Sequence, residues 1–130
     1  MSKRSISCDA APAALGPYSQ AIHAGDFLFI SGQLGIDPVS MQLSGGGVAG
    51  QAHQAFANAL AIVNSAGGSP ADVVKVVLYL VNLDQFDEVN TVMSQHFVQP
   101  YPARACIEVA ALPKGALVEI ETTAYLPGAQ

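Results

Sequence analysis

The chain has 130 residues, of which 51% are hydrophobic and 12% are charged, and its net charge is −5 at pH 7. This composition excludes disordered and fibrous proteins, and the length allows one globular domain, residues 1–130, with a real core. The five Lys and Arg residues are scattered, so we expect no nucleic-acid partner. No apolar run approaches the ~20 residues that cross a bilayer, and the first twenty residues lack a signal-peptide core. We therefore expect a cytoplasmic protein with no membrane partner.

Three strands are predicted near the amino terminus. The first lies near residues 4–8, the second spans residues 20–24 and the third spans residues 27–30. Gly25-Asp26, between the second and the third, suits a hairpin turn. Ser31-Gly32 is expected to end the third strand.

A long helix is predicted from Val48 to Ala66, because its apolar residues recur at helical spacing and Gly67-Gly68 follows it. The preceding residues 35–47 are expected to form a loop. Their triple glycine, Gly45 to Gly47, is not followed by the Gly-Lys-Ser/Thr of a phosphate-binding loop, so we interpret it as flexible loop.

The second half of the chain predicts a short helical turn capped by Ser69, an apolar strand over residues 73–81, and a second helix capped by Asp84. Two further strands are predicted over residues 104–109 and 118–126. The order strand-strand-strand-helix-strand-helix-strand-strand is typical of an α+β sheet with helices on one face. The apolar strand is expected to be covered on both faces, or on one by a partner subunit.

Arg104 is the unusual residue of this pattern, because a permanent cation stands in a mostly apolar strand. Alternation places it on one face with Cys106 and Glu108, and places Glu119 and Glu121 on one face of the last strand. If the two strands are neighbours, Arg104 and a carboxylate face the same space. Two interpretations stay open: an Arg–Glu pair at a sheet edge, and a guanidinium fork that binds a ligand carboxylate through two hydrogen bonds.

The other reactive side chains give weaker signals. His23, His53 and His96 show no metal-ligand spacing and are interpreted as surface or packed histidines. Cys8 and Cys106 are expected to be free thiols. Cys106 has no evident histidine base, so packing or a backbone contact is favoured over an activated thiolate. We expect neither a metal nor a cofactor.

Several short motifs, taken together in their order and spacing, resemble the RidA/YjgF family of small enamine/imine deaminases over nearly the whole chain. Each motif is weak alone. They are Gly16-Pro17-Tyr18-Ser19-Gln20-Ala21, Ser31-Gly32-Gln33, Ala66-Gly67-Gly68-Ser69, Phe86 with Val89-Asn90, Pro102-Ala103-Arg104 with Cys106, Leu112-Pro113-Lys114 and Val118-Glu119-Ile120-Glu121.

The resemblance implies a chorismate-mutase-like α+β fold, a mixed sheet with two helices on one face, that assembles as a homotrimer with ligand sites in the clefts between subunits. It implies that Arg104 binds the substrate carboxylate bidentately, that Cys106 offers backbone contacts and that Glu119 positions a water. The residues that line or support the pocket would be Tyr18, Ser31, Gly32 and Asn90. Tyr18 has an alternative role, which is to plug a turn into the core.

The implied reaction is hydrolysis of 2-aminoacrylate and related imines, released by pyridoxal-phosphate dehydratases, to a 2-oxo acid and ammonia. This removes a reactive enamine before it damages those enzymes. An imine carbon is already electrophilic, so the site needs only to hold the carboxylate, orient a water and move protons. A carboxylate near Arg104 would tend to stay ionised, which suits a proton acceptor.

Two alternatives to the deaminase stay open. One is a non-catalytic small-ligand binder or chaperone on the same trimer. The other is a ribonuclease or translation inhibitor, which the acidic balance disfavours. The sequence departs from the family at Met93, where relatives often carry an aromatic residue, and at Ala105, where a serine is frequent. Met93 bears on the shape of the pocket wall and hence on substrate size.

Overall fold

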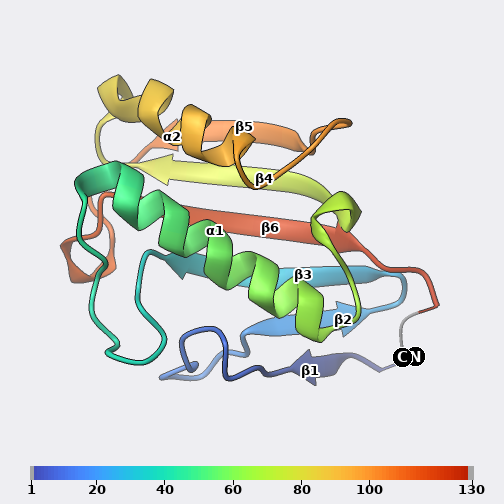
Figure 1. The fold of residues 1–130 in the computed structure, drawn as a ribbon. Coiled ribbons are helices and arrows are strands. Elements are labelled where there is room, and N and C mark those ends of the chain that lie inside the picture. The colour runs from blue at the N-terminus through green and yellow to red at the C-terminus, as the bar shows by residue number, and fades with distance from the viewer. Residues whose placement is uncertain (1, 129–130) are drawn as a thin grey trace.

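The structure is a computed structural model that describes residues 2–128. Six strands form one mixed sheet in the order β1-β2-β3-β6-β4-β5 (Figure 1). Neighbouring strands are antiparallel except β4 and β5, which are parallel and are joined through α2. The strands are β1 (Arg4–Ile6), β2 (Ala21–Ala24), β3 (Phe27–Leu34), β4 (Val73–Leu80), β5 (Ala103–Glu108) and β6 (Val118–Tyr125).

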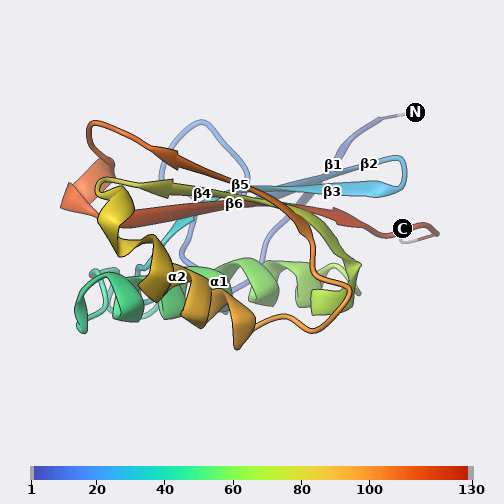
Figure 2. The same ribbon diagram turned by 90° about the horizontal axis from the view of Figure 1, so that it is seen from above.

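Both helices, α1 (Gly47–Ser65) and α2 (Phe86–Ser94), cover the same face of the sheet, as the view in Figure 2 shows. Three short 3-10 turns complete the elements: η1 (Pro70–Asp72), η2 (Leu83–Gln85) and η3 (Pro113–Gly115). This arrangement confirms the α+β mixed sheet with two helices on one face. None of the helices within residues 2–128 is long and apolar enough to cross a membrane.

The core lies between the helices and one face of the sheet. Alternate residues of the central strands, such as Leu78 and Ile120, are fully buried beneath α1 and α2. Phe56 of α1 is also fully buried, and its ring meets the edge of Phe97 at a centroid distance of 5.8 Å. Burying one such side chain stabilises the fold by about 1.5–3 kcal/mol. The apolar residues that recur at helical spacing in α1 therefore face the core, as the sequence predicts.

The opposite face of the sheet is uncovered in the single chain. It carries three exposed aromatic side chains, Phe27, Phe29 and Tyr125, whose exposed fractions are 40%, 51% and 43%. The rings of Phe27 and Tyr125 pack together across β3 and β6 at a centroid distance of 5.4 Å. A contiguous apolar patch of this kind is typical of an association surface.

Two boundaries differ from the predictions. β3 does not end at Ser31-Gly32 but continues to Leu34, with a register shift against β6 between Ile30 and Gln33. A bulge absorbs an extra residue without ending the strand, and it changes the direction of the side chains beside it. The second helix begins after η2, where the Asn82 side chain accepts a hydrogen bond from the Asp84 N–H. Asn82 therefore caps η2, whereas α2 begins after Gln85, whose side chain makes no capping hydrogen bond, so the predicted cap at Asp84 is wrong.

Candidate functional site

Arg104 lies at the start of the edge strand β5, and its side chain faces the helix layer. In the register of β4 and β5 it pairs with Val76, which is fully buried beneath the helices. Its guanidinium carbon lies 4.9 Å from the centre of the Phe86 ring. Its Nη1 donates a hydrogen bond to Asn90 Oδ1 and lies 3.8 Å from Met93 Sδ. All three partners belong to α2, and all are uncharged.

The guanidinium therefore keeps its positive charge uncompensated. Within residues 2–128 no carboxylate pairs with Arg104, so the chain on its own does not form the Arg–Glu pair. A ring beneath the guanidinium and an amide at one edge fix its orientation. Its remaining N–H donors stay available to a ligand.

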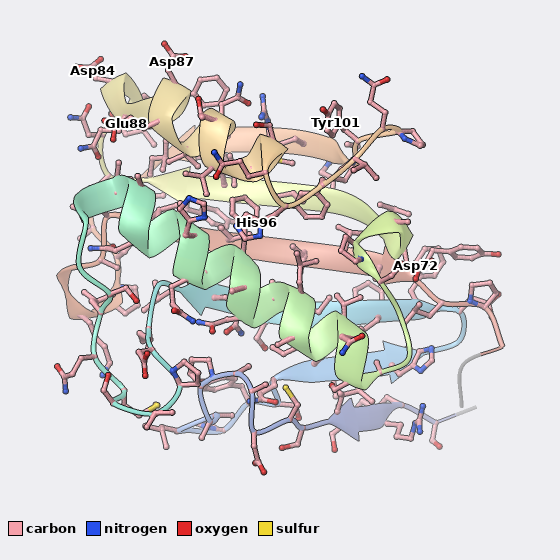
Figure 3. The ribbon with its side chains drawn as sticks, in the orientation of Figure 1. Asp72, Asp84, Asp87, Glu88, His96 and Tyr101 are labelled. Carbon is pink, nitrogen blue, oxygen red and sulfur yellow. The ribbon has the colours of Figure 1, made fainter. Side chains whose placement is uncertain are left out.

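A cavity of about 480 Å³ opens beside the guanidinium. Tyr101 stands on the segment that leads from α2 into β5 (Figure 3). We call this space the arginine cavity; it is lined by Asn90, Met93, Ser94, Tyr101, Pro102 and Arg104. Its walls are mostly uncharged, so Arg104 dominates its electrostatics. The arrangement can hold a small carboxylate.

Glu119 belongs to a different cavity, of about 530 Å³. We call it the glutamate cavity; its lining includes Tyr18, Ser31, Gly32, Met41, Lys114 and Glu119. Four of the predicted site residues therefore meet here, while Arg104 and Asn90 meet in the arginine cavity. The predicted site is divided into two halves on the surface of one chain.

The bulge in β3 shapes the glutamate cavity. A Cβ atom at Gly32 would lie 2.7 Å from Glu119 Oε2, so only a glycine lets this carboxyl group lie against the backbone of β3. Ser31, the preceding residue, donates from Oγ to the Ser19 carbonyl oxygen at 2.6 Å. This bond ties β3 to the segment that carries Tyr18. Ser31 and Gly32 thus hold the cavity wall in place.

Arg104 and a carboxylate of the last strand were expected to face the same space if their strands are neighbours, and a single chain does not meet this condition. β4 lies between β5 and β6, so the two strands are not neighbours. Across the sheet, Arg104 aligns with Val76 and Thr122, which are buried under the helices, whereas Glu119 aligns with Tyr79 on the uncovered face. The two side chains therefore point to opposite faces.

The electrostatics of Glu119 follow from this separation. Burial raises the pKa of Glu119 above its ordinary value, and the nearby Glu121 raises it further. The expectation that this carboxylate tends to stay ionised depended on Arg104 lying close to it, and within residues 2–128 Arg104 is not among the groups that shift the pKa of Glu119. A carboxyl group with a raised pKa takes up and releases protons closer to neutral pH.

Tyr18 and Cys106 have clear positions. Tyr18 is 55% exposed at the glutamate cavity, so the alternative in which it plugs the core is wrong. Cys106 is half-buried against the core, and it and Cys8 are free thiols. Burial raises the pKa of the Cys106 thiol, although Arg104 and a backbone hydrogen bond oppose this. A raised pKa does not favour an activated thiolate.

Two residues of the site carried no separate role in the sequence interpretation. Phe86 enters the sequence interpretation only as part of a motif with Val89-Asn90, yet its ring supports the Arg104 guanidinium. Lys114 lines the glutamate cavity and has a φ of 59°, a left-handed conformation that is uncommon for a residue other than glycine. The sequence offers a signal for this tight turn, because Lys114 stands between Pro113 and Gly115 just before β6.

Two of the three histidines, His53 and His96, lie next to each other. His53 Nδ1 and His96 Nε2 are 3.1 Å apart, and His96 stacks on the buried ring of Phe56. His96 lies between α1 and the end of α2 (Figure 3). Burial lowers the pKa of His96, and His53 lowers it further. Among residues 2–128 there is no group of three or more His, Cys, Asp or Glu that could hold a metal ion.

The fold and the two half-sites define a small α+β protein that presents an uncompensated, oriented arginine in one cavity and a carboxyl group in another. A family model described as Endoribonuclease L-PSP matches residues 8–126. The chain belongs to this family, the RidA/YjgF family, as the motifs indicate.

Individual relatives match this chain over nearly its full length. The 2-iminobutanoate/2-iminopropanoate deaminase of Bos taurus is 49% identical over 122 residues, which cover 94% of this chain and 89% of the relative. The crystal structure of RidA from an Antarctic Psychrobacter is 50% identical with a TM-score of 0.91, covering 95% of this chain and 99% of the other. E. coli TdcF with bound serine is 35% identical with a TM-score of 0.87, covering 94% and 98%.

Proposed function

We propose that the chain is an imine deaminase that hydrolyses small carboxylate-bearing imines and enamines, such as 2-iminopropanoate, 2-iminobutanoate and 2-aminoacrylate, to 2-oxo acids and ammonia. The observation that carries this proposal is the guanidinium of Arg104, which is oriented by uncharged groups of α2 and is open to a cavity. Relatives that are 47% and 49% identical carry the name of this activity, which supports the same substrate class.

Arg104 binds the substrate carboxylate in this proposal. A planar guanidinium offers two parallel N–H donors that match a carboxylate, which a lysine ammonium does not. Asn90 and Phe86 hold the fork, and Cys106, two residues along the same face of β5, offers backbone groups beside it. E. coli TdcF, a relative, has been crystallised with bound serine. Serine carries a carboxylate and is small enough for a cavity of this size.

Glu119 positions and activates the water. Water adds to the carbon of the protonated imine while Glu119 accepts one of the protons of the water, which gives a neutral carbinolamine. Glu119 returns this proton to the nitrogen. The C–N bond then breaks as the hydroxyl oxygen forms the C=O bond and gives its proton to Glu119, so that ammonia and a 2-oxo acid are released. The imine carbon is electrophilic by itself, so orientation and proton transfer are the main requirements. The raised pKa of Glu119 suits both accepting and returning the proton.

A homotrimer completes the site in this proposal. One chain supplies Arg104 and the next supplies Glu119, together with Tyr18, Ser31 and Gly32, because a single chain holds these groups on opposite faces of its sheet. The exposed aromatic face supports such an assembly, since burying it removes apolar surface from water. The cleft between two chains then contains all the required groups.

A coupled reaction tests the activity. The protein is added to a threonine or serine dehydratase reaction, and 2-oxo acid formation is followed while free imine is trapped with semicarbazide. Faster conversion of imine to 2-oxo acid by the parent, but not by Glu119→Gln, supports the deaminase. Binding of 2-oxo acids with no acceleration would instead support the non-catalytic binder.

A mixing experiment tests the shared site. Arg104→Ala and Glu119→Gln are each expected to be inactive. When equal amounts are unfolded together and reassembled, a site between two chains combines an intact Arg104 with an intact Glu119 in about a quarter of cases. Recovery of about a quarter of parent activity supports the inter-subunit site. No recovery, with trimers confirmed by light scattering, contradicts it.

A further inference from the structure

Three polar side chains, Glu119, Tyr79 and Glu121, lie side by side on the uncovered face of β4 and β6. In the register of these strands Tyr79 is the direct partner of Glu119. Glu121 lies two residues further along β6, on the same face, because Ile120 between them is buried on the helix side. Tyr79 Oη donates a hydrogen bond of 2.7 Å to Glu121 Oε1. Tyr79 is thus bonded to the carboxylate next to Glu119 rather than to Glu119 itself.

We propose that Tyr79 and Glu121 are positioning residues for Glu119: Tyr79 fixes the Glu121 carboxylate, and Glu121 places a second negative charge beside Glu119. This inference rests on the proposed role of Glu119 as the proton acceptor. A general base works best when its affinity for a proton matches the working pH. The like charge increases that affinity, and the hydrogen bond keeps the charge at a constant distance.

The directions in which the pKa values of Glu119 and Tyr79 are shifted agree with this geometry. The pKa of Glu119 is raised by burial and then by Glu121. The pKa of Tyr79 is raised, first of all by its hydrogen bond to Glu121, so the phenol keeps its proton and remains a donor. A like charge near a carboxylate generally raises the pKa of that carboxyl group.

The surroundings explain why such a device is needed. The Glu119 partner on β3 is Leu34, which is uncharged. In the proposed trimer, Arg104 of a neighbouring chain approaches Glu119 and favours its ionised form, which makes it a weaker base. Glu121 opposes that effect. The titratable groups around Glu119 in its own chain are Tyr79 of β4, Glu121 of β6, Lys114 of η3 and Tyr18, whereas Lys75 of β4 aligns with Thr123, two residues beyond Glu121.

The central test is Glu121→Gln, which keeps the size of the side chain and removes its charge. The Glu119 carboxyl group is titrated by 13C NMR, and kcat/KM for imine hydrolysis is measured against pH. Both the Glu119 titration and the acidic limb of the profile should move to lower pH. At pH 7 kcat should fall about two- to fivefold with little change in KM, because Glu119 becomes a weaker base. Asp26→Asn, an equal change of charge in the β2–β3 turn, should leave both measurements unchanged.

Tyr79→Phe separates position from charge. It removes the hydrogen bond but keeps both carboxylates, so the Glu119 titration should move in the same direction by a smaller amount. In the double variant Tyr79→Phe/Glu121→Gln the effect should equal that of Glu121→Gln alone, since Tyr79 acts through Glu121.

An unchanged Glu119 titration in folded Glu121→Gln would overturn the inference, as would a lower rate without a shifted titration. If Glu121→Gln fails to fold, an unchanged titration in Tyr79→Phe overturns it instead. The NMR titration needs no activity. A shifted titration in a protein without imine hydrolysis would overturn the proposed function while leaving the coupling between the carboxylates supported.

Discussion

Arg104 and Glu119 point to opposite faces of one sheet, and the whole of β4 lies between their strands. Strands are spaced about 4.8 Å apart, so the two backbones are separated by roughly 10 Å even before the side chains diverge. No rotamer change brings the two charged ends together within one chain. A site that uses both groups must therefore take them from two copies of the chain.

Arg104→Lys tests the guanidinium fork. The lysine keeps the charge but loses the two parallel donors and the planar contact with Phe86, so KM should rise and kcat/KM should fall about a hundredfold. The chain provides a matched control in Arg4→Lys, which alters the other arginine on the exposed strand β1. Steady-state kinetics with 2-iminobutanoate give KM and kcat/KM for both variants. Parent-like KM in Arg104→Lys would show that charge alone holds the substrate.

Gly32→Ala tests the close approach of Glu119 to β3. The added Cβ would lie 2.7 Å from Glu119 Oε2, and the flexible carboxyl end should move away rather than the fold collapse. We expect kcat to fall about tenfold or more, with unchanged thermal unfolding, because a misplaced base orients water poorly. Gly45→Ala is the control, since a Cβ there meets nothing within 4 Å. Equal loss in both variants would contradict this explanation.

Met93→Phe tests which residue limits substrate size. Met93 is buried on α2, lines the arginine cavity and contacts the Arg104 guanidinium. A rigid ring should narrow the cavity, so the preference for 2-iminopropanoate over the larger 2-iminobutanoate should increase about tenfold. Met93→Leu removes the sulfur contact at similar volume and should leave the preference near that of the parent. The ratio of the two kcat/KM values is the measurement.

The histidine pair predicts a loss of stability in mild acid. The pKa of His96 is lowered in the folded protein by burial and by His53, whereas in the unfolded chain it returns to about 6.5. The unfolded state therefore binds more protons as the pH falls through 6.5, and the free energy of unfolding should decrease until His96 is also protonated in the folded state.

Urea unfolding at pH 7.5 and 5.5, at one fixed protein concentration, measures this dependence. His96→Phe keeps a ring on Phe56 without a titrating group, so its unfolding midpoint should change less between the two pH values. His53→Gln removes the neighbouring charge and should give an intermediate dependence. An equal change in His96→Phe and the parent would assign the effect to other groups.

Much of the fold could be predicted from local pattern. Helical spacing identified α1, alternation identified β5 and β6, and Gly25-Asp26 identified the hairpin between β2 and β3. The bulge at Ser31-Gly32 could not be predicted, because the strand continues through it only by pairing with β6, far away in the sequence. Pairing across the sheet overrides a local signal of this kind.

The family and the residue types of the candidate site could be inferred from the sequence, because motif order, strand period and the single unexplained arginine are all visible along the chain. The grouping of these residues depends on the tertiary structure. Alternation tells which residues of one strand share a face, but it does not tell which strands are neighbours or which face the helices cover. Insertion of β4 between β5 and β6 separates Arg104 from Glu119, and packing of α1 against α2 joins His53 to His96.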